Sequence, residues 1–210
     1  MENTKSTRDK RFIIPGALLL VAAALKSVGM FLTPGSGFGV GHETDLVMLW
    51  LNRISYIHLG LLLSVFVLMI VFTRKKRLVS WFVVALISIF VFNAADLIAT
   101  ALVAQSSSSA SGTVAEFGLT FLMGVETCVS VIAFPSFAYG LYLLVKNRAT
   151  RALFISTCAF YVVKLLSSYL PLARSFNQAL RAGTSWAEIL LFICFGLVLI
   201  LMPPEKQIDD

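Results

Sequence analysis

Charged and hydrogen-bonding side chains lie inside long apolar segments of this chain, and they are the residues whose types could do chemistry. The ionisable ones within or beside these segments are Lys26, Arg53, His58, Asp96, Glu116, Glu126, Lys164 and Glu188. A charge at the centre of a bilayer costs about 2.5–3.5 kcal/mol on insertion scales, so such residues usually face the interior of a helix bundle. They often mark a binding site or a pathway for ions or protons.

Helical spacing places further polar residues on the same faces as these charges. One stripe consists of Asn93, Asp96 and Thr100, and a second consists of Thr157, Tyr161, Lys164 and Ser168. Glu126 shares a face with Ser130, and His58 shares one with Ser55. Several segments therefore each contribute a polar patch.

The elements that must position these residues are membrane-spanning helices. The chain has 210 residues and is 58% apolar and 13% charged, whereas a soluble domain is about 45–50% apolar and about 25% charged. A helix needs about 20 apolar residues to cross a bilayer. Six segments qualify, at 12–33, 54–72 (or from 46), 78–104, 117–145, 152–172 and 186–202. The sequence thus predicts an all-α, polytopic transmembrane helical bundle of six spans, and it excludes a soluble enzyme, a disordered tail and a disulfide scaffold.

Basic residues orient this bundle because they stay on the cytoplasmic side during insertion. With the N-terminus inside, that side holds Lys5, Arg8, Lys10, Arg11, Arg74, Lys75, Lys76, Arg77, Lys146, Arg148, Arg151 and Lys206. The opposite side holds Arg53, Arg174 and Arg181. We therefore expect an N-in, C-in topology, with a cytoplasmic tail at 1–11, one transmembrane domain at 12–203 and a second cytoplasmic tail at 204–210. The net charge of +6 is then mostly a topogenic signal, and no nucleic-acid partner is expected.

The polar residues fall at similar depths, in the outer half of the bundle or near its midplane, when depth is counted at about 1.5 Å per residue. In this count Glu116 and Glu188 begin their spans at the outer edge. We expect an outward-facing polar cavity that binds or transports a small polar or charged solute. Lys26 and Lys164 would hold an anionic group, and Asp96 and Glu126 would neutralise the lysines or accept a cation. The predicted substrate-binding residues are Lys26, His58, Asn93, Asp96, Glu126, Tyr161, Lys164 and Ser168.

Two other interpretations remain open. The charged residues could pair only with one another and fix the packing, as buried ion pairs can do without adding much stability. The protein would then be a non-transporting accessory, immunity or sensor subunit. Small residues at 22–24, Ser27 and Gly29 would allow close approach either within the bundle or by a membrane-protein partner. The third interpretation is an intramembrane enzyme using Glu126, His58 and Asp96.

Motifs for cofactors and catalysis are missing. His42 and His58 are the only histidines, and His42 falls between spans, so a haem lacks a pair of ligands at matched depth. The GHETD segment around His42 lacks the second histidine of a zinc-hydrolase motif. The three cysteines, Cys128, Cys158 and Cys194, show no metal-type spacing and are expected to be free thiols. We expect no cofactor and no metal, and the chain is not expected to be an enzyme.

In size and in its six-span, N-in, C-in layout, though in no residue motif, the chain resembles the substrate-binding components of energy-coupling-factor vitamin transporters. That resemblance implies solute binding from outside and a first helix whose small residues meet a partner. The predicted inner connections, 73–77 and 146–151, are short, which favours a bacterial plasma membrane. The longer outer connections are predicted at 34–45, 105–113 and 173–185.

Overall fold

All regular secondary structure in the described part of the chain is helical. The computed structural model describes residues 10–32, 44–73, 75–106, 112–169 and 174–201. A short 3₁₀ turn, η1 (Lys10–Phe12), precedes α1 (Ile13–Leu32), α2 (Thr44–Phe72), α3 (Lys76–Ser106), α4 (Gly112–Val145), α5 (Arg148–Tyr169) and α6 (Arg174–Ile200). The all-α class predicted from the sequence is confirmed for these residues.

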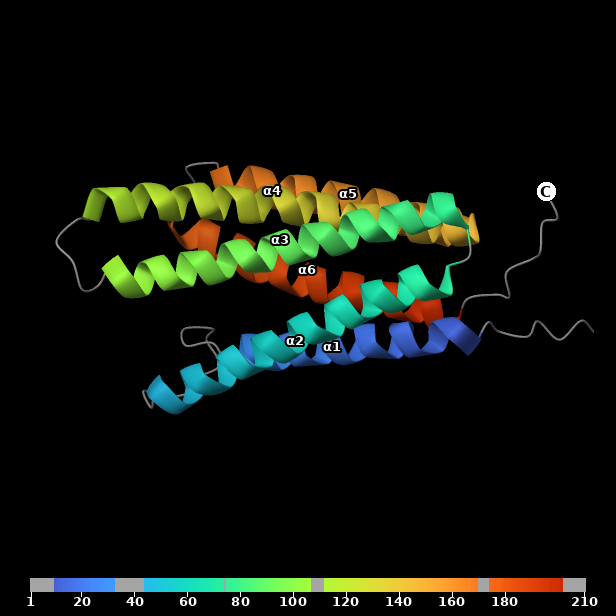
Figure 1. Cartoon of the computed structure of the whole chain (residues 1–210), viewed down its shortest axis with the longest axis horizontal. Coiled ribbons are helices and arrows are strands. Elements are labelled where there is room, and N and C mark those ends of the chain that lie inside the picture. Colours follow the sequence, from blue (N-terminus) through green and yellow to red (C-terminus); the bar gives the residue numbers. More distant parts are fainter. Residues whose placement is uncertain (1–9, 33–43, 74, 107–111, 170–173, 202–210) are drawn as a thin grey trace, which may run out of the picture.

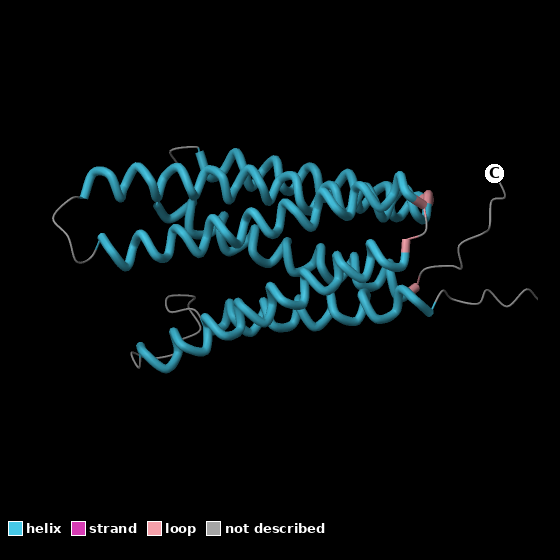
Figure 2. Tube along the Cα trace, in the orientation of Figure 1, coloured by secondary structure: helices cyan, strands magenta, loops and turns pink. Residues whose placement is uncertain are grey.

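The helices form a closed ring of contacts in chain order. Each helix packs against the next one along the chain, and α1 also packs against α6. Successive helices run in opposite directions (Figure 1 and Figure 2). The start of α1, the connections from α2 to α3 and from α4 to α5, and the end of α6 therefore lie at the same end of the bundle.

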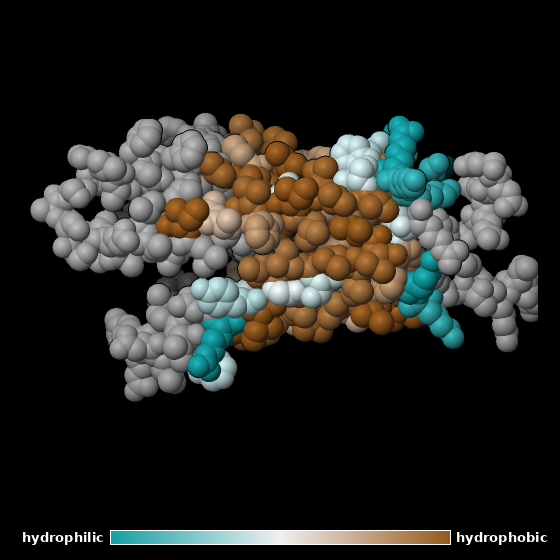
Figure 3. Space-filling view, viewed as in Figure 1, coloured by the Kyte–Doolittle hydropathy of each residue, from teal (hydrophilic) through white to brown (hydrophobic). Residues whose placement is uncertain are grey.

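This end carries the basic side chains, and the surface beyond it is apolar. We call it the basic end, and it is formed by Lys10, Arg11, Lys75, Lys76, Arg77, Lys146, Arg148 and Arg151. Figure 3 shows hydrophilic residues at this end and a broad hydrophobic band next to them. Large apolar side chains in that part of the surface point outward, among them Val71 and Phe90, each 67% exposed. Such a surface is compatible with contact to lipid.

Four helices in the described residues are long and apolar enough to cross a membrane. The qualifying windows are Lys10–Phe31, Arg53–Phe72, Arg148–Ser167 and Gly183–Ile200. The segment Val131–Val145 of α4 is a shorter apolar helix. Together with the apolar surface, these helices are those expected of an integral membrane protein.

The last helix differs most from its predicted bounds. The sequence predicts a loop at 173–185, and this prediction is wrong, because α6 begins at Arg174. The segment is too polar to count as part of an apolar span, but it contains good helix formers such as Gln178, Ala179 and Leu180. The helix therefore starts well before its apolar part, and this changes the position of Glu188 along it.

The connection between α4 and α5 consists of Lys146 and Asn147. Lys146 has a φ of 48° and its N–H donates to the Tyr142 carbonyl at 2.7 Å, which ends α4. The Asn147 side-chain oxygen accepts the Thr150 N–H at 2.7 Å, and the Thr150 hydroxyl accepts the Asn147 N–H at 3.3 Å. This reciprocal cap starts α5 and lets the chain reverse within two residues.

Phenylalanine side chains fill the centre of the bundle, between the helices. Phe137 of α4 is 1% exposed. Its ring meets Phe66 of α2 at 4.9 Å, Phe82 of α3 at 5.6 Å and Phe195 of α6 at 5.4 Å between centroids, all in edge-to-face geometry. The contacts connect α4 to α2 and α6, which are not its neighbours around the bundle, as well as to α3. The interior of the bundle is therefore packed in the half nearer the basic end.

The contact between α1 and α6 depends on two glycines. A Cβ atom on Gly16 would lie 2.8 Å from the Gly196 carbonyl oxygen, and one on Gly196 would lie 2.9 Å from the Gly16 carbonyl oxygen. The backbones therefore approach more closely than any side chain allows, as in small-residue contacts between membrane helices. Ala22 and Ala23 of α1 are also buried, so part of the small-residue face of this helix packs inside the bundle.

Glycine-to-alanine substitutions at Gly196 and Gly60 should change stability in opposite directions. Gly196→Ala should destabilise the protein by about 1–3 kcal/mol, because the added methyl group forces α1 and α6 apart. Gly60→Ala should stabilise it by about 0.5–1 kcal/mol, since nothing lies within 4 Å of the added Cβ and alanine favours a helix. Unfolding midpoints of the two variants in one detergent measure the effect, and equal shifts would contradict the close α1–α6 contact.

Candidate functional site

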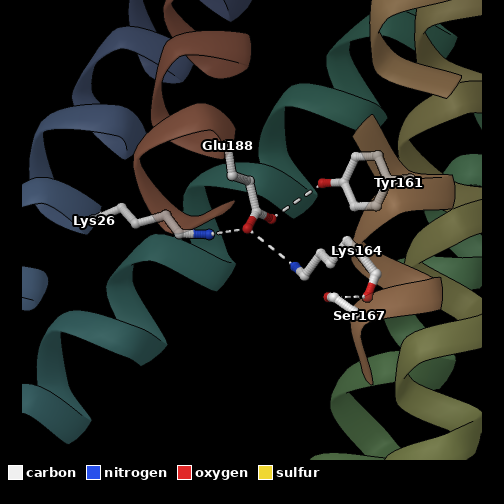
Figure 4. Close-up of polar contacts among 5 residues, drawn as sticks. All are labelled: Lys26, Tyr161, Lys164, Ser167 and Glu188. Atoms are coloured by element: carbon white, nitrogen blue, oxygen red, sulfur yellow. Dashed lines mark hydrogen bonds and ion pairs between the residues drawn. The ribbon is translucent and has the colours of Figure 1, made fainter. Parts of the chain in front are cut away.

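A carboxylate on α6 binds two ammonium groups from two other helices. Glu188 Oε2 lies 2.8 Å from Lys26 Nζ of α1 and 3.1 Å from Lys164 Nζ of α5. The Tyr161 hydroxyl of α5 donates to the other carboxylate oxygen, Oε1, at 3.1 Å. Figure 4 shows Glu188 between Lys26 on one side and Lys164 with Tyr161 on the other. We call these four residues the charged cluster.

The members of the charged cluster differ in exposure. The Glu188 side chain is 10% exposed, whereas the side chains of Lys26 and Lys164 are 24% and 32% exposed. Tyr161 is almost fully buried, at 1%. The negative charge therefore lies inside the bundle, and the positive charges lie partly at its accessible surface.

The charged cluster lies at one level of the bundle. Measured from the helix ends at the basic end, its residues and His58 lie between 12 and 16 positions along their helices. At 1.5 Å per residue this is about 18–24 Å from that end, whereas the hydrocarbon layer of a bilayer is about 30 Å thick. The level is therefore beyond the middle of such a layer when it is counted from the basic end.

Aromatic rings hold the cluster in place. The Tyr161 ring stacks on Phe134 of α4 with centroids 5.2 Å apart and an angle of 9° between the planes. Lys26 Nζ lies 5.4 Å from the centroid of Phe192, and Lys164 Nζ lies 5.5 Å from that of Tyr161. The negative faces of the rings attract these cations and offset part of the cost of removing them from water.

His58 of α2 lies beside the charged cluster, because it contacts the Phe192 ring that Lys26 also contacts. The centroids of His58 and Phe192 are 5.8 Å apart. The Nε2 atom of His58 is buried and has no hydrogen-bond partner within the described residues. A buried polar atom without a partner costs free energy, and at this position it could bond to a solute.

The structure brings together Lys26, Tyr161 and Lys164, which the sequence analysis assigned to one site, and places His58 next to them. For four other predicted site residues the structure describes only the helix backbone, and their side chains lie outside the described residues: Asn93, Asp96, Glu126 and Ser168. The expected neutralisation of the lysines by Asp96 and Glu126 therefore stays a prediction.

Glu188 was missing from the predicted site. It was placed at the outer edge because the apolar run of the last span begins at Trp186. In the structure it lies in the middle of α6, 14 residues after Arg174. A signal was nevertheless present, because Glu188, Phe192 and Phe195 are three and four residues apart and form one helix face.

Metal-binding groups are not found in this part of the chain. Within the described ranges there is no group of three His, Cys, Asp or Glu side chains that could hold a metal ion. Cys128, Cys158 and Cys194 are free, and the first and last of them are exposed. The charged cluster itself presents one carboxylate, two ammonium groups and one phenolic hydroxyl.

Comparisons with known proteins add no relative to this picture. No protein family, no curated protein and no solved structure matches the chain.

Replacing Tyr161 with phenylalanine tests the hydrogen bond that anchors Glu188. Tyr161→Phe should lower the free energy of unfolding by about 1.5–3 kcal/mol, because it removes a hydrogen bond to a buried carboxylate. Tyr56→Phe is the matched control, since Tyr56 is 61% exposed and its change should stay within about 0.5 kcal/mol. Thermal unfolding of both variants in detergent measures the difference, and a Tyr161→Phe midpoint equal to that of the control would refute the anchoring role.

Proposed function

We propose that this chain is a six-span membrane protein with both termini in the cytoplasm, and that it binds or transports a small polar or charged solute at the charged cluster. The observation that carries the proposal is the meeting of Lys26, Lys164 and Glu188, from three helices, at one level of the bundle. Charges are rare inside membrane domains and are commonly found at substrate or ion pathways.

The six-span arrangement rests on the ring of helices. Four helices qualify as spans by composition, and α3 and α4, of 31 and 34 residues, exceed the length needed to cross. Both run antiparallel to their neighbours in the ring (Figure 1). A bilayer that holds the other four helices would therefore also surround α3 and α4.

The orientation rests on the basic end. Lysine and arginine residues near the ends of spans favour the cytoplasmic side. Apart from Arg53, the exposed basic side chains of the described residues gather at this end (Figure 3). With this end inside the cell, the charged cluster lies in the outer half of the membrane. The partly exposed ammonium groups then offer a solute a site that opens outward. Together with the short connections at the basic end, this topology favours a bacterial plasma membrane.

A second candidate is a non-transporting accessory, immunity or sensor subunit in which the cluster only fixes helix packing. The observation that favours it is the full pairing of Glu188, which has donors on both carboxylate oxygens. A cluster with that role alone should be closed to solvent. The 24% and 32% exposure of the lysine side chains therefore favours solute binding over the packing role.

Cysteine labelling tests the orientation. In a background where the three native cysteines are replaced by serine, Ser108→Cys should react with a membrane-impermeant maleimide added to intact cells, and Lys76→Cys should not. Lys76→Cys should react once the membrane is permeabilised, which controls for expression and reactivity. Labelling of Lys76→Cys in intact cells, with Ser108→Cys protected, would reverse the proposed orientation.

A thermal-shift screen tests solute binding. Purified protein should be stabilised by a member of a panel of small organic acids, amines and neutral polar compounds, because a ligand that binds only the folded state raises its unfolding temperature. The shift should vanish in Lys164→Met and persist in Lys76→Met, which removes an equal charge at the basic end. A panel without any stabilising compound, or a shift unaffected by Lys164→Met, would contradict solute binding at the cluster.

A further inference from the structure

We infer that the solute is an organic anion, and that its carboxylate binds the ammonium groups of Lys26 and Lys164 in competition with Glu188. This inference rests on the proposed function, because it names the chemical class of solute for the same site. It also assigns Glu188 a role, that of an internal carboxylate that occupies the anion site when no solute is bound.

The charged side chains of the cluster differ in exposure. The two lysine side chains are 24% and 32% exposed, and the Glu188 side chain is 10% exposed. The accessible charge of the cluster is therefore mainly positive. In a region with little water to screen charges, this positive charge attracts anions and repels amines.

Two like charges approach each other closely in the cluster. Both ammonium groups contact the same oxygen atom, Glu188 Oε2, so they lie close to each other. An anion between them relieves their repulsion, and a carboxylate is the group that already does so here. The site is thus built for a carboxylate, whether it comes from the chain or from a solute.

The two ammonium groups of the cluster carry more N–H donors than one carboxylate can accept. The Glu188 carboxylate has donors on both oxygens, namely the two lysines and the Tyr161 hydroxyl. An ammonium group has three N–H donors. Lys26 uses one of these donors on Glu188, and its ammonium group also lies over the Phe192 ring. The ammonium groups of the cluster can therefore donate hydrogen bonds to a further acceptor.

If a solute anion competes with Glu188, neutralising Glu188 should change the affinity in a direction that the other interpretations do not predict. Neutralising Glu188 removes the competitor but keeps both lysines, so an anion should bind more tightly. If the cluster bound a cation, the same change would abolish binding. If the cluster only fixed the packing, the change would lower stability and create no ligand dependence.

The experiment uses sodium acetate, acetamide and methylammonium chloride as probes of the three charge classes. Each is titrated against full-length protein in detergent, with sodium chloride at matched ionic strength as the baseline, and the unfolding midpoint is recorded. The variants are Glu188→Gln, Lys26→Met and Lys26→Arg, and Lys76→Met is the control for loss of a charge elsewhere. Lys26→Arg and Lys26→Met keep the test decisive if Glu188→Gln cannot be purified.

We expect acetate alone among the probes to raise the midpoint of the wild type and of Lys76→Met, by about 2–4 °C near saturation. In Glu188→Gln the half-saturating acetate concentration should fall about tenfold. The acetate shift should be lost in Lys26→Met and kept in Lys26→Arg.

The contrary results separate this inference from the proposed function. A shift with methylammonium or acetamide that Lys26→Met removes would overturn the anion class and leave solute binding at the cluster intact. An acetate shift that Glu188→Gln abolishes would overturn the competition with Glu188. If no probe gave a shift that depends on Lys26, both the anion class and the role of the cluster as a binding site would be refuted.

Discussion

The contact of one glutamate oxygen with two ammonium groups is the interaction on which the arrangement of α1, α5 and α6 depends. Each of these charges would cost free energy alone in a membrane, so each helix is acceptable there only when its partners lie beside it. Glu188 Oε2 pairs with the lysine of α1 and with the lysine of α5 at the same time. The pairing therefore favours an arrangement in which α1 and α5 both lie next to α6.

The charges can meet only if the packing of the helices lets α1 and α5 lie next to α6. Lys26 reaches Glu188 because α1 and α6 approach closely at Gly16 and Gly196, on the side nearer the basic end. The phenylalanine contacts around Phe137 fill the space that a ring of six helices leaves in its centre. Apolar packing thus dominates the half near the basic end, and the charged cluster lies farther along the same helices (Figure 4).

The helical class and three members of the cluster could be predicted from the sequence, and the reason lies in periodicity. Tyr161 and Lys164 are three residues apart in an apolar helix, so they share a face whatever the tertiary structure is. The partner of these residues could not be predicted in the same way. Its depth was counted from the start of an apolar run, whereas α6 begins 12 residues before Trp186. The contact also requires that α1 closes on α6, and nothing in local sequence determines which helices become neighbours.

The carboxylate and the ammonium groups of the cluster have different surroundings. Under the proposed function, this difference lets one set of charges both hold helices together and bind a solute. Glu188 is held from the inner side by Tyr161, whose stacking on Phe134 fixes the hydroxyl that donates to Oε1. The ammonium groups bind the other oxygen from the more accessible side. An ion pair closed to water resists exchange because a separated charge has nothing to solvate it, and a fully exposed pair contributes little to stability. Lysines that are 24% and 32% exposed lie between these limits. Their bonds to Glu188 favour one helix arrangement. In the proposed binding reaction they are exchanged for bonds to the solute, while the carboxylate keeps its hydrogen bond to Tyr161.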